Sequence, residues 1–275
     1  MLHTPAWELL HQRDPAATRK TMQSWMRIDQ EHPTAADTVA AINSLWAAVA
    51  ILEFNIDNHE EQLLQLSQSH WDRRKPHDRH APRESMDQAF AFADACMRAF
   101  DLTKNERFKT LATTYVQSWV TQISDSAAGE RRPTEANSPD DASLSYLPTV
   151  AGESCLTLWT ATHDQDYQQV VERIAEVIEH SVGSPNNKYN TAEDYGRVIH
   201  FLNRASEVLE KPNYRDMAIL VADEAMEKLH VRETGMFRSR VGVDRCDATD
   251  GPGWLLLALL SLDGDDPTES SSLRF

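Results

Sequence analysis

The sequence contains little glycine, with 9 such residues in a chain of 275. Runs of β-branched residues are also few, whereas alanine, leucine, glutamate and glutamine are common. Strands favour β-branched and aromatic residues, and the turns between them draw on glycine, so this composition argues against a β protein. Residues of high helix propensity dominate instead, and we therefore expect an all-α fold.

Cysteines and long apolar runs are scarce as well. Cys96, Cys155 and Cys246 are far apart and form no CxxC pair, which predicts reduced thiols without a disulfide framework. The longest apolar runs, Leu45–Leu52 and Trp254–Leu262, are too short to span a bilayer. The sequence therefore predicts no membrane partner.

Basic residues are outnumbered by acidic ones. The chain has 27 lysines and arginines and 43 aspartates and glutamates, which gives a formal net charge of −16. Phosphate groups repel such a surface, so we expect no nucleic-acid partner. The N-terminal residues show no charged region followed by an apolar core, which argues against a signal peptide. A cytoplasmic location is then the default prediction, with export as the alternative if a leader has been removed.

Helical periodicity is the dominant pattern along the chain. It predicts about ten helices, one of them beginning with a capping box of Thr103 and Glu106, and a small β-hairpin within 231–249. The helices are expected to form a single domain over 1–263, followed by a disordered tail over 264–275. The predicted helices are 15–31, 34–56, 58–71, 84–101, 103–124, 142–162, 164–182, 192–209, 211–230 and 250–263.

A repeated turn divides these helices into hairpins. In FDLTKNERF, TATHDQDY and VLEKPNY, a helix end and a short polar turn precede an aromatic residue, which is Phe108, Tyr167 or Tyr214. The first helix of each pair is more apolar than the second, and helices that are apolar on all sides are buried. The pattern therefore predicts an inner layer of buried helices and an outer layer of amphipathic ones.

This turn resembles that of six-hairpin (α/α) toroid proteins, and the resemblance covers about residues 84–263. It implies an (α/α) toroid, or a partial toroid because fewer helices are predicted than six hairpins contain. The superfamily includes glycoside hydrolases, unsaturated glucuronyl hydrolases and polysaccharide lyases. The resemblance therefore implies a carbohydrate-active enzyme of the lyase or hydrolase type that needs no cofactor, and the basic loops suggest an acidic oligosaccharide as its ligand.

The first candidate site is SHWDRRKPHDRHAPRE, a locally basic segment of an acidic chain. Its His77, Arg79 and His80 are suited to binding an anionic substrate, and a histidine can also donate or accept a proton. An H-x-x-H metal site is the second interpretation, but the sequence offers no third ligand, so we predict no metal. The structural alternative is a solvated loop whose arginines pair with nearby carboxylates.

The second candidate is DRCDATDGPGW, which precedes an apolar run that is expected to form a buried inner helix. Asp250 lies near the predicted helix N-terminus, where the helix dipole favours a carboxylate, and Arg245 lies just before it. The toroid resemblance implies a substrate cleft at one end of the inner helices. The carboxylate of Asp250 would then bind sugar hydroxyls while Trp254 stacks on the ring, and in a hydrolytic variant Asp250 or Asp194 would be the catalytic acid. The alternative is a capping aspartate with salt bridges.

The third candidate is YNTAEDYGRVIHFLNRA, where Arg197, His200 and Arg204 share one helix face. Such charges are costly on a buried helix unless they are paired or line a polar cavity. The resemblance to polysaccharide lyases implies that Tyr195 or His200 abstracts a proton from the sugar and that Arg197 binds its carboxylate. The alternative is a buried ion-pair network, for which the nearby carboxylates are Glu193, Asp194 and Glu207.

A non-catalytic helical-repeat protein is the alternative function. Such a protein would bind a partner protein, or form a homodimer, through its concave face. The two functions differ in one geometric expectation. In an enzyme the candidate residues converge on one cleft, whereas in a scaffold they lie on separate surfaces or are fully paired.

Overall fold

The computed structural model describes most of the C-terminal two thirds of the chain. The described residues are 86–127, 149–182, 189–246 and 251–263, with a few isolated positions before them. Every structural statement below refers to these residues.

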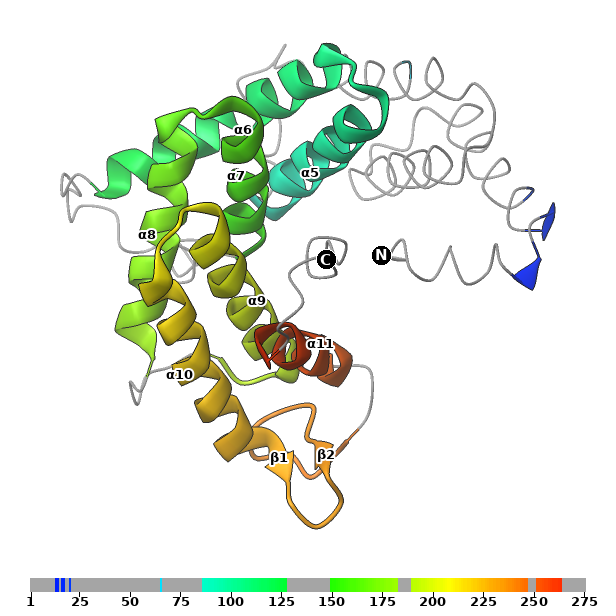
Figure 1. Ribbon diagram of the computed structural model, residues 1–275, viewed down its shortest axis with the longest axis vertical. Coiled ribbons are helices and arrows are strands. Elements are labelled where there is room, and N and C mark those ends of the chain that lie inside the picture. The colour runs from blue at the N-terminus through cyan, green and yellow to red at the C-terminus, as the bar shows by residue number, and fades with distance from the viewer. Residues whose placement is uncertain are drawn as a thin grey trace, which may run out of the picture. The chain divides into compact units, whose positions relative to one another are not determined.

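The chain divides into two compact units, Met1–Thr121 and Gln122–Phe275. The described residues form seven helices and one two-stranded antiparallel hairpin (Figure 1). The elements are α5 (Met86–Thr103), α6 (Glu106–Ala127), α7 (Thr149–Thr162), α8 (Gln165–Ser181), α9 (Ala192–Val208), α10 (Pro212–Leu229), β1 (His230–Val231), β2 (Met236–Phe237) and α11 (Pro252–Asp263).

The mostly helical prediction is confirmed for this part of the chain. The seven helices correspond to the last seven predicted ones, and the hairpin lies in the segment where it was expected. The predicted helices 15–31, 34–56 and 58–71 lie almost wholly outside the described residues, as does the tail over 264–275. The predicted number of about ten helices and the single domain therefore stay predictions.

The repeated turn has the same geometry after α5 and after α7. Lys104 and His163 both adopt the left-handed backbone conformation, with φ of 56°. Each donates its N–H to the carbonyl four residues earlier at 2.7 Å, which ends the helix. Asn105 and Asp164 then cap the next helix, because their side-chain oxygens accept the N–H two residues on at 3.1 Å. Similar sequence therefore produces the same turn twice.

The third turn reaches the same result by different means. Glu210 also has a left-handed conformation, with φ of 54°. No side chain caps α10, and Pro212 occupies its first turn instead, where a missing N–H costs nothing. The aromatic residue after each turn is buried in all three cases, at Phe108, Tyr167 and Tyr214.

The predicted capping box at Thr103 is wrong. Thr103 ends α5, and its hydroxyl donates to the carbonyl of Ala99 at 2.8 Å. The cap of α6 is Asn105. A true capping box occurs at α9, where Thr191 and Asp194 each accept the other's backbone N–H. A threonine followed three residues later by a carboxylate occurs at both positions, and the preceding helix decides which residue is left to cap.

Helix α9 is the central helix of the second unit. It contacts α7, α8, α10 and α11, and Figure 1 shows it between α7, α10 and α11. Ten of its seventeen residues are buried, as are eight of the fourteen in α7. Helices α8 and α10 bury one face only. Within this unit the expected difference between buried and amphipathic helices is therefore confirmed.

The last helix, α11, was predicted to be wholly buried, and the structure shows that it is not. In α11 only Leu255, Ala258 and Leu262 are buried, and Leu256, Leu257 and Leu260 are exposed. No helix among the described residues combines the length and the hydropathy that a bilayer crossing needs. The apolar run after DRCDATDGPGW therefore forms a short helix with one face packed on α9.

Candidate functional site

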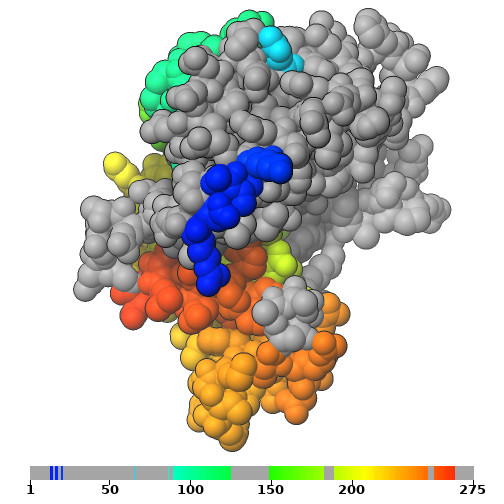
Figure 2. Space-filling view, turned by 90° about the vertical axis from the view of Figure 1, so that its right-hand side faces the viewer, coloured from blue at the N-terminus to red at the C-terminus, as the bar shows by residue number. Residues whose placement is uncertain are grey.

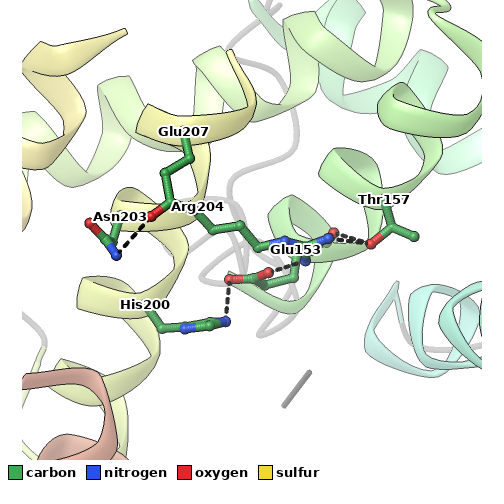
Figure 3. Close-up of polar contacts among 6 residues, drawn as sticks. All are labelled: Glu153, Thr157, His200, Asn203, Arg204 and Glu207. Atoms are coloured by element: carbon green, nitrogen blue, oxygen red, sulfur yellow. Dashed lines mark hydrogen bonds and ion pairs between the residues drawn. The ribbon is translucent and has the colours of Figure 1, made fainter. Parts of the chain in front are cut away.

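A carboxylate on α7 lies between two basic side chains of α9. Oε2 of Glu153 accepts a hydrogen bond from Nη1 of Arg204 at 2.5 Å. Oε1 of Glu153 lies 3.7 Å from Nε2 of His200, which is beyond hydrogen-bonding distance (Figure 3). We call Glu153, Thr157, His200 and Arg204 the Glu153 cluster.

Arg204 is itself held on α7 by two further contacts. Its Nη2 donates to the hydroxyl of Thr157 at 2.8 Å, and its Nη1 lies 3.3 Å from the backbone oxygen of Glu153. The guanidinium group thus spans one turn of α7, from Glu153 to Thr157. A planar guanidinium group fixes the direction of a carboxylate better than an ammonium group does. Glu153 is therefore held in one orientation.

Two glycines let the helices of the site approach closely. A Cβ atom on Gly152 would collide with the ring of Phe201, so the absence of a side chain lets α7 lie against α9. A Cβ atom on Gly196 would lie 2.7 Å from the backbone nitrogen of Leu255, so α11 packs directly on the backbone of α9. Each glycine directly precedes a charged residue of the site. The sequence therefore places close backbone packing next to these charges.

Burial determines the charge state of the histidine. His200 is 8% exposed, and the Glu153 side chain is 16% exposed. Burial lowers the pKa of His200 below its ordinary value of 6.5, Glu153 partly opposes this, and Arg204 and Arg197 lower the pKa further. The imidazole is therefore neutral at neutral pH and can accept a proton. Within the described part of the chain, Oε1 of Glu153 accepts no hydrogen bond.

A stacked pair lies one helical turn before His200. The guanidinium group of Arg197 lies 4.5 Å from the centre of the Trp254 ring, and Nε of Arg197 donates to Glu193 at 2.8 Å. Gly251, with a positive φ of 78°, packs directly against Glu193 and begins the approach to α11. The structure thus brings Arg197 and Trp254 together on the side of α9 that carries His200.

Tyr195 lies on a different side of α9 from His200. Its hydroxyl donates to Oε1 of Glu224 on α10 at 2.8 Å, and Lys228 binds the same oxygen at 2.5 Å. Burial raises the pKa of Tyr195, and the hydrogen bond to Glu224 raises it further. No described contact joins this tyrosine to the Glu153 cluster. We call Tyr195, Glu224 and Lys228 the Tyr195 cluster.

The other predicted site residues are not brought to this cluster by any described contact. Arg245 is exposed, and its backbone oxygen accepts the N–H of Ser239 at 2.9 Å. Asp250, His77, Arg79 and His80 lie outside the described residues. The roles predicted for these five residues stay predictions. Among the described residues no three His, Cys, Asp or Glu side chains gather as metal ligands would.

The ion-pair alternative predicted for α9 is only partly the arrangement observed. Arg197 does pair with Glu193, at 2.7 Å. Asp194 instead belongs to the capping box, and Glu207 lies 3.5 Å from the amide of Asn203. The partner of Arg204 is Glu153, which lies 51 residues away in sequence.

Sequence reasoning missed Glu153 and Thr157. One signal for the carboxylate was nevertheless present. In α7, TVAGESCLTLWTAT, Glu153 is the only charged residue of an otherwise uncharged and largely buried helix. A lone charge in such a helix requires a partner or a function. Thr157 carries no comparable signal, because threonines are frequent in this helix and most bond to their own backbone.

No protein-family model matches the sequence, and a comparison with curated proteins finds no match either. The structure is nevertheless similar to a solved structure of D-mannose isomerase. The TM-score is 0.57 at 8% sequence identity, and the match covers 82% of this chain and 70% of that chain.

Two mannanase structures are similar as well. One is the α-1,6-mannanase GH76A of Salegentibacter sp. HEL1_6, an inactive variant in complex with α-1,6-mannotriose, with a TM-score of 0.53, 14% identity and coverage of 84% of this chain and 72% of that chain. The other is a GH76 α-mannanase of Bacteroides thetaiotaomicron, with a TM-score of 0.50, 13% identity and coverage of 81% and 66%. The resemblance to the (α/α) toroid proteins is thus confirmed, as a likeness of fold to carbohydrate-active enzymes.

Proposed function

We propose that this protein is a carbohydrate-active enzyme whose Glu153 cluster moves a proton on a neutral sugar. The observation that carries the proposal is the pairing of a buried, neutral His200 with Glu153, whose Oε1 accepts no hydrogen bond from the described residues. The likeness of fold to D-mannose isomerase and to mannanases supports a sugar as the substrate. Perturbed titratable groups that face each other are typical of catalytic sites.

The residues of the cluster divide the work between them. His200 is the general base, because its lowered pKa keeps the imidazole neutral at the operating pH. Glu153 accepts a hydrogen bond from a sugar hydroxyl through Oε1 and stabilises the imidazolium that forms. Arg204 and Thr157 are positioning residues, since Arg204 holds the carboxylate and Thr157 holds Arg204.

Aldose–ketose isomerisation is the reaction that suits this pair best. In an open-chain aldose the base removes the proton from C2, an enediol forms, and the proton is returned to C1. The proton of the C2 hydroxyl moves to the C1 oxygen, so the reaction is balanced and consumes no co-reactant. One neutral base beside one oriented carboxylate is sufficient for these proton transfers.

The charges of the site favour a neutral sugar over the acidic saccharide expected from the sequence. Arg204 is already paired with Glu153, and Arg197 with Glu193. A uronate carboxylate would have to compete with a carboxylate that each arginine already holds. The exposed part of Trp254 instead offers an apolar surface for the face of a sugar ring.

Hydrolysis of a mannoside is the second candidate, and the likeness to two mannanases favours it. Glycoside hydrolysis generally uses two carboxyl groups, whose separation is set by the mechanism. The described residues place one carboxylate, Glu153, in the cluster. The predicted acid Asp250 would have to supply the second, which makes Asp250→Asn the variant that separates hydrolysis from isomerisation.

The test follows the proton directly. The protein is incubated with D-mannose and related aldoses in deuterated water, and NMR records ketose formation and deuterium at C1 and C2. We expect a ketose that carries solvent deuterium, and none with His200→Asn. Cleavage of α-1,6-mannotriose without isomerisation would replace this function by hydrolysis. Neither activity, together with no saccharide binding by calorimetry, would favour the non-catalytic scaffold.

A further inference from the structure

The outward face of α10 exposes apolar side chains between carboxylates. Leu220 is 56% exposed, and Ile219 and Met226 are exposed as well, although the opposite face of the helix is buried. Three acidic residues at helical spacing flank these apolar positions, so the face is both apolar and negatively charged. We call this face the acidic stripe, and it consists of Asp216, Ile219, Leu220, Asp223, Met226 and Glu227.

The segment that follows α10 has the opposite charge. Met236 on β2 is 50% exposed, and Val241 and Val243 on the next loop are exposed too. Arg232, Arg240 and Arg245 are exposed in the same segment, against the exposed carboxylates of Glu233 and Asp244. The segment therefore keeps an excess of positive charge in a chain whose net charge is strongly negative. We call this second face the basic hairpin surface, and it consists of Arg232, Met236, Arg240, Val241 and Val243.

The two surfaces are neighbours in the fold. Helix α10 runs directly into β1, and the N–H of Arg238 donates to the carbonyl of Leu229 at 2.8 Å, which ties the hairpin to the helix end. Figure 2 shows α10 and the hairpin side by side on one face of the molecule. A two-fold axis beside them would place each surface of one protomer against the other surface of its partner.

We propose that this face is an interface between two copies of the chain, in which the acidic stripe of each protomer packs on the basic hairpin surface of its partner. Opposite charges steer and align such an association, and the apolar residues between them supply most of its stability. Contiguous exposed apolar patches are unusual on a monomer, and interfaces are their common explanation. The interface is independent of the proposed isomerase function.

A second copy is a better occupant than a foreign protein, because the complementary surface is carried by the same chain. The acidic stripe carries three carboxylates and the basic hairpin surface two arginines, and both surfaces also contain exposed apolar residues. An acidic stripe alone would equally suit a basic peptide of another protein. Because the basic hairpin surface lies next to the acidic stripe on the same chain, two copies of the chain can each supply the surface that the other needs.

The test uses charge reversal in the full-length protein. The positive variant carries Asp223→Lys and Glu227→Lys, so both of its surfaces are basic. The negative variant carries Arg232→Glu and Arg240→Glu, so both are acidic. Light scattering coupled to gel filtration, together with sedimentation velocity, measures the mass over a range of protein and salt concentrations. We expect a wild-type dimer that weakens with salt and at least about tenfold weaker association in either variant alone.

Mixing the two variants distinguishes this interface from any other. In a two-fold interface the positive variant pairs with the negative one at both contacts, so an equimolar mixture should regain the dimer as a heterodimer. Ile219→Ser with Leu220→Ser weakens association without changing a charge, and circular dichroism and the thermal midpoint verify that each variant folds. A wild type that stays monomeric, a dimer that both reversals leave intact, or a mixture that fails to pair would overturn the proposal.

Discussion

Helix α9 carries two ionisable clusters on different sides, and they are built in different ways. Toward α10, Tyr195 and Lys228 both bind Oε1 of Glu224, so a buried acceptor receives two donors. Toward α7, Arg204 binds one oxygen of Glu153, while the other oxygen lies 3.7 Å from a neutral His200. The Tyr195 cluster is closed by its own hydrogen bonds. The Glu153 cluster leaves an oriented carboxylate oxygen without one among the described residues.

We expect this difference to separate a structural network from a functional one. A buried polar network stabilises a fold when its members satisfy each other, and an unsatisfied buried oxygen costs about 1 to 3 kcal/mol. A protein keeps an unsatisfied buried polar atom mainly where that atom has to interact with a ligand or a substrate. We therefore expect substitutions in the Tyr195 cluster to change stability and substitutions in the Glu153 cluster to change activity.

The same substitution in both clusters is the strongest test of this comparison. Glu153→Gln keeps the size of the side chain but removes its charge, so the imidazolium loses its stabilising partner. We expect kcat/KM for ketose formation to fall on the order of a hundredfold. Glu224→Gln is the matched control and should change kcat/KM less than about twofold, because it does not contact His200.

Both variants need a stability measurement, because an unfolded protein is inactive for a trivial reason. Urea denaturation gives the free energy of unfolding of each variant, and turnover is compared only at temperatures where both are folded. Equal losses of turnover in the two variants would show that α9 acts as one structural network, and the distinction between the clusters would be wrong.

Removing the hydroxyl of Tyr195 should have the second largest effect. Tyr195→Phe keeps the packing of the ring but leaves Glu224 with one donor fewer in a buried position. We expect the free energy of unfolding to fall by about 1 kcal/mol, with unchanged kcat/KM. Urea denaturation and the isomerase assay measure the two quantities. A large loss of turnover at unchanged stability would favour Tyr195 over His200 as the base, the other choice that the sequence left open.

The pH dependence of stability should come mainly from the Glu153 cluster. Because burial lowers the pKa of His200 in the folded protein, the unfolded chain binds this proton more readily. Stability from the neutral histidine is therefore fully present above the ordinary pKa of 6.5 and is lost as the pH falls below it. The loss cannot exceed about 1.4 kcal/mol per pH unit for one group.

His200→Asn measures this contribution, because it removes the titrating group and retains a polar side chain. We expect the free energy of unfolding of the variant to fall less steeply than that of the wild type between about pH 7 and about pH 5. Parallel curves for the two proteins would mean that the folded structure does not shift the pKa of His200.

The sequence predicts features that depend on near neighbours and misses those that depend on distant ones. The turns at Lys104 and His163 could be predicted because every group in them lies within a few residues. The pairing of Arg204 with Glu153 could not, because periodicity shows which residues share a face but not which helix lies opposite. That Tyr195 faces α10 could not be predicted for the same reason.

Thr157→Val is the smallest of the predicted effects and tests whether Arg204 needs its second contact. The substitution preserves the shape of the side chain but removes the acceptor for Nη2 of Arg204. Arg204 is partly exposed, so water replaces some of the lost interaction, and we expect about 0.5 kcal/mol of lost stability. A less firmly held Glu153 should reduce kcat by about twofold and leave KM unchanged.

Thr160→Val is the matched control, because the Thr160 hydroxyl donates only to the backbone of its own helix. If the two variants lose the same stability and the same kcat, the hydrogen bond from Arg204 to Thr157 contributes nothing of its own, and Glu153 alone fixes the orientation of Arg204.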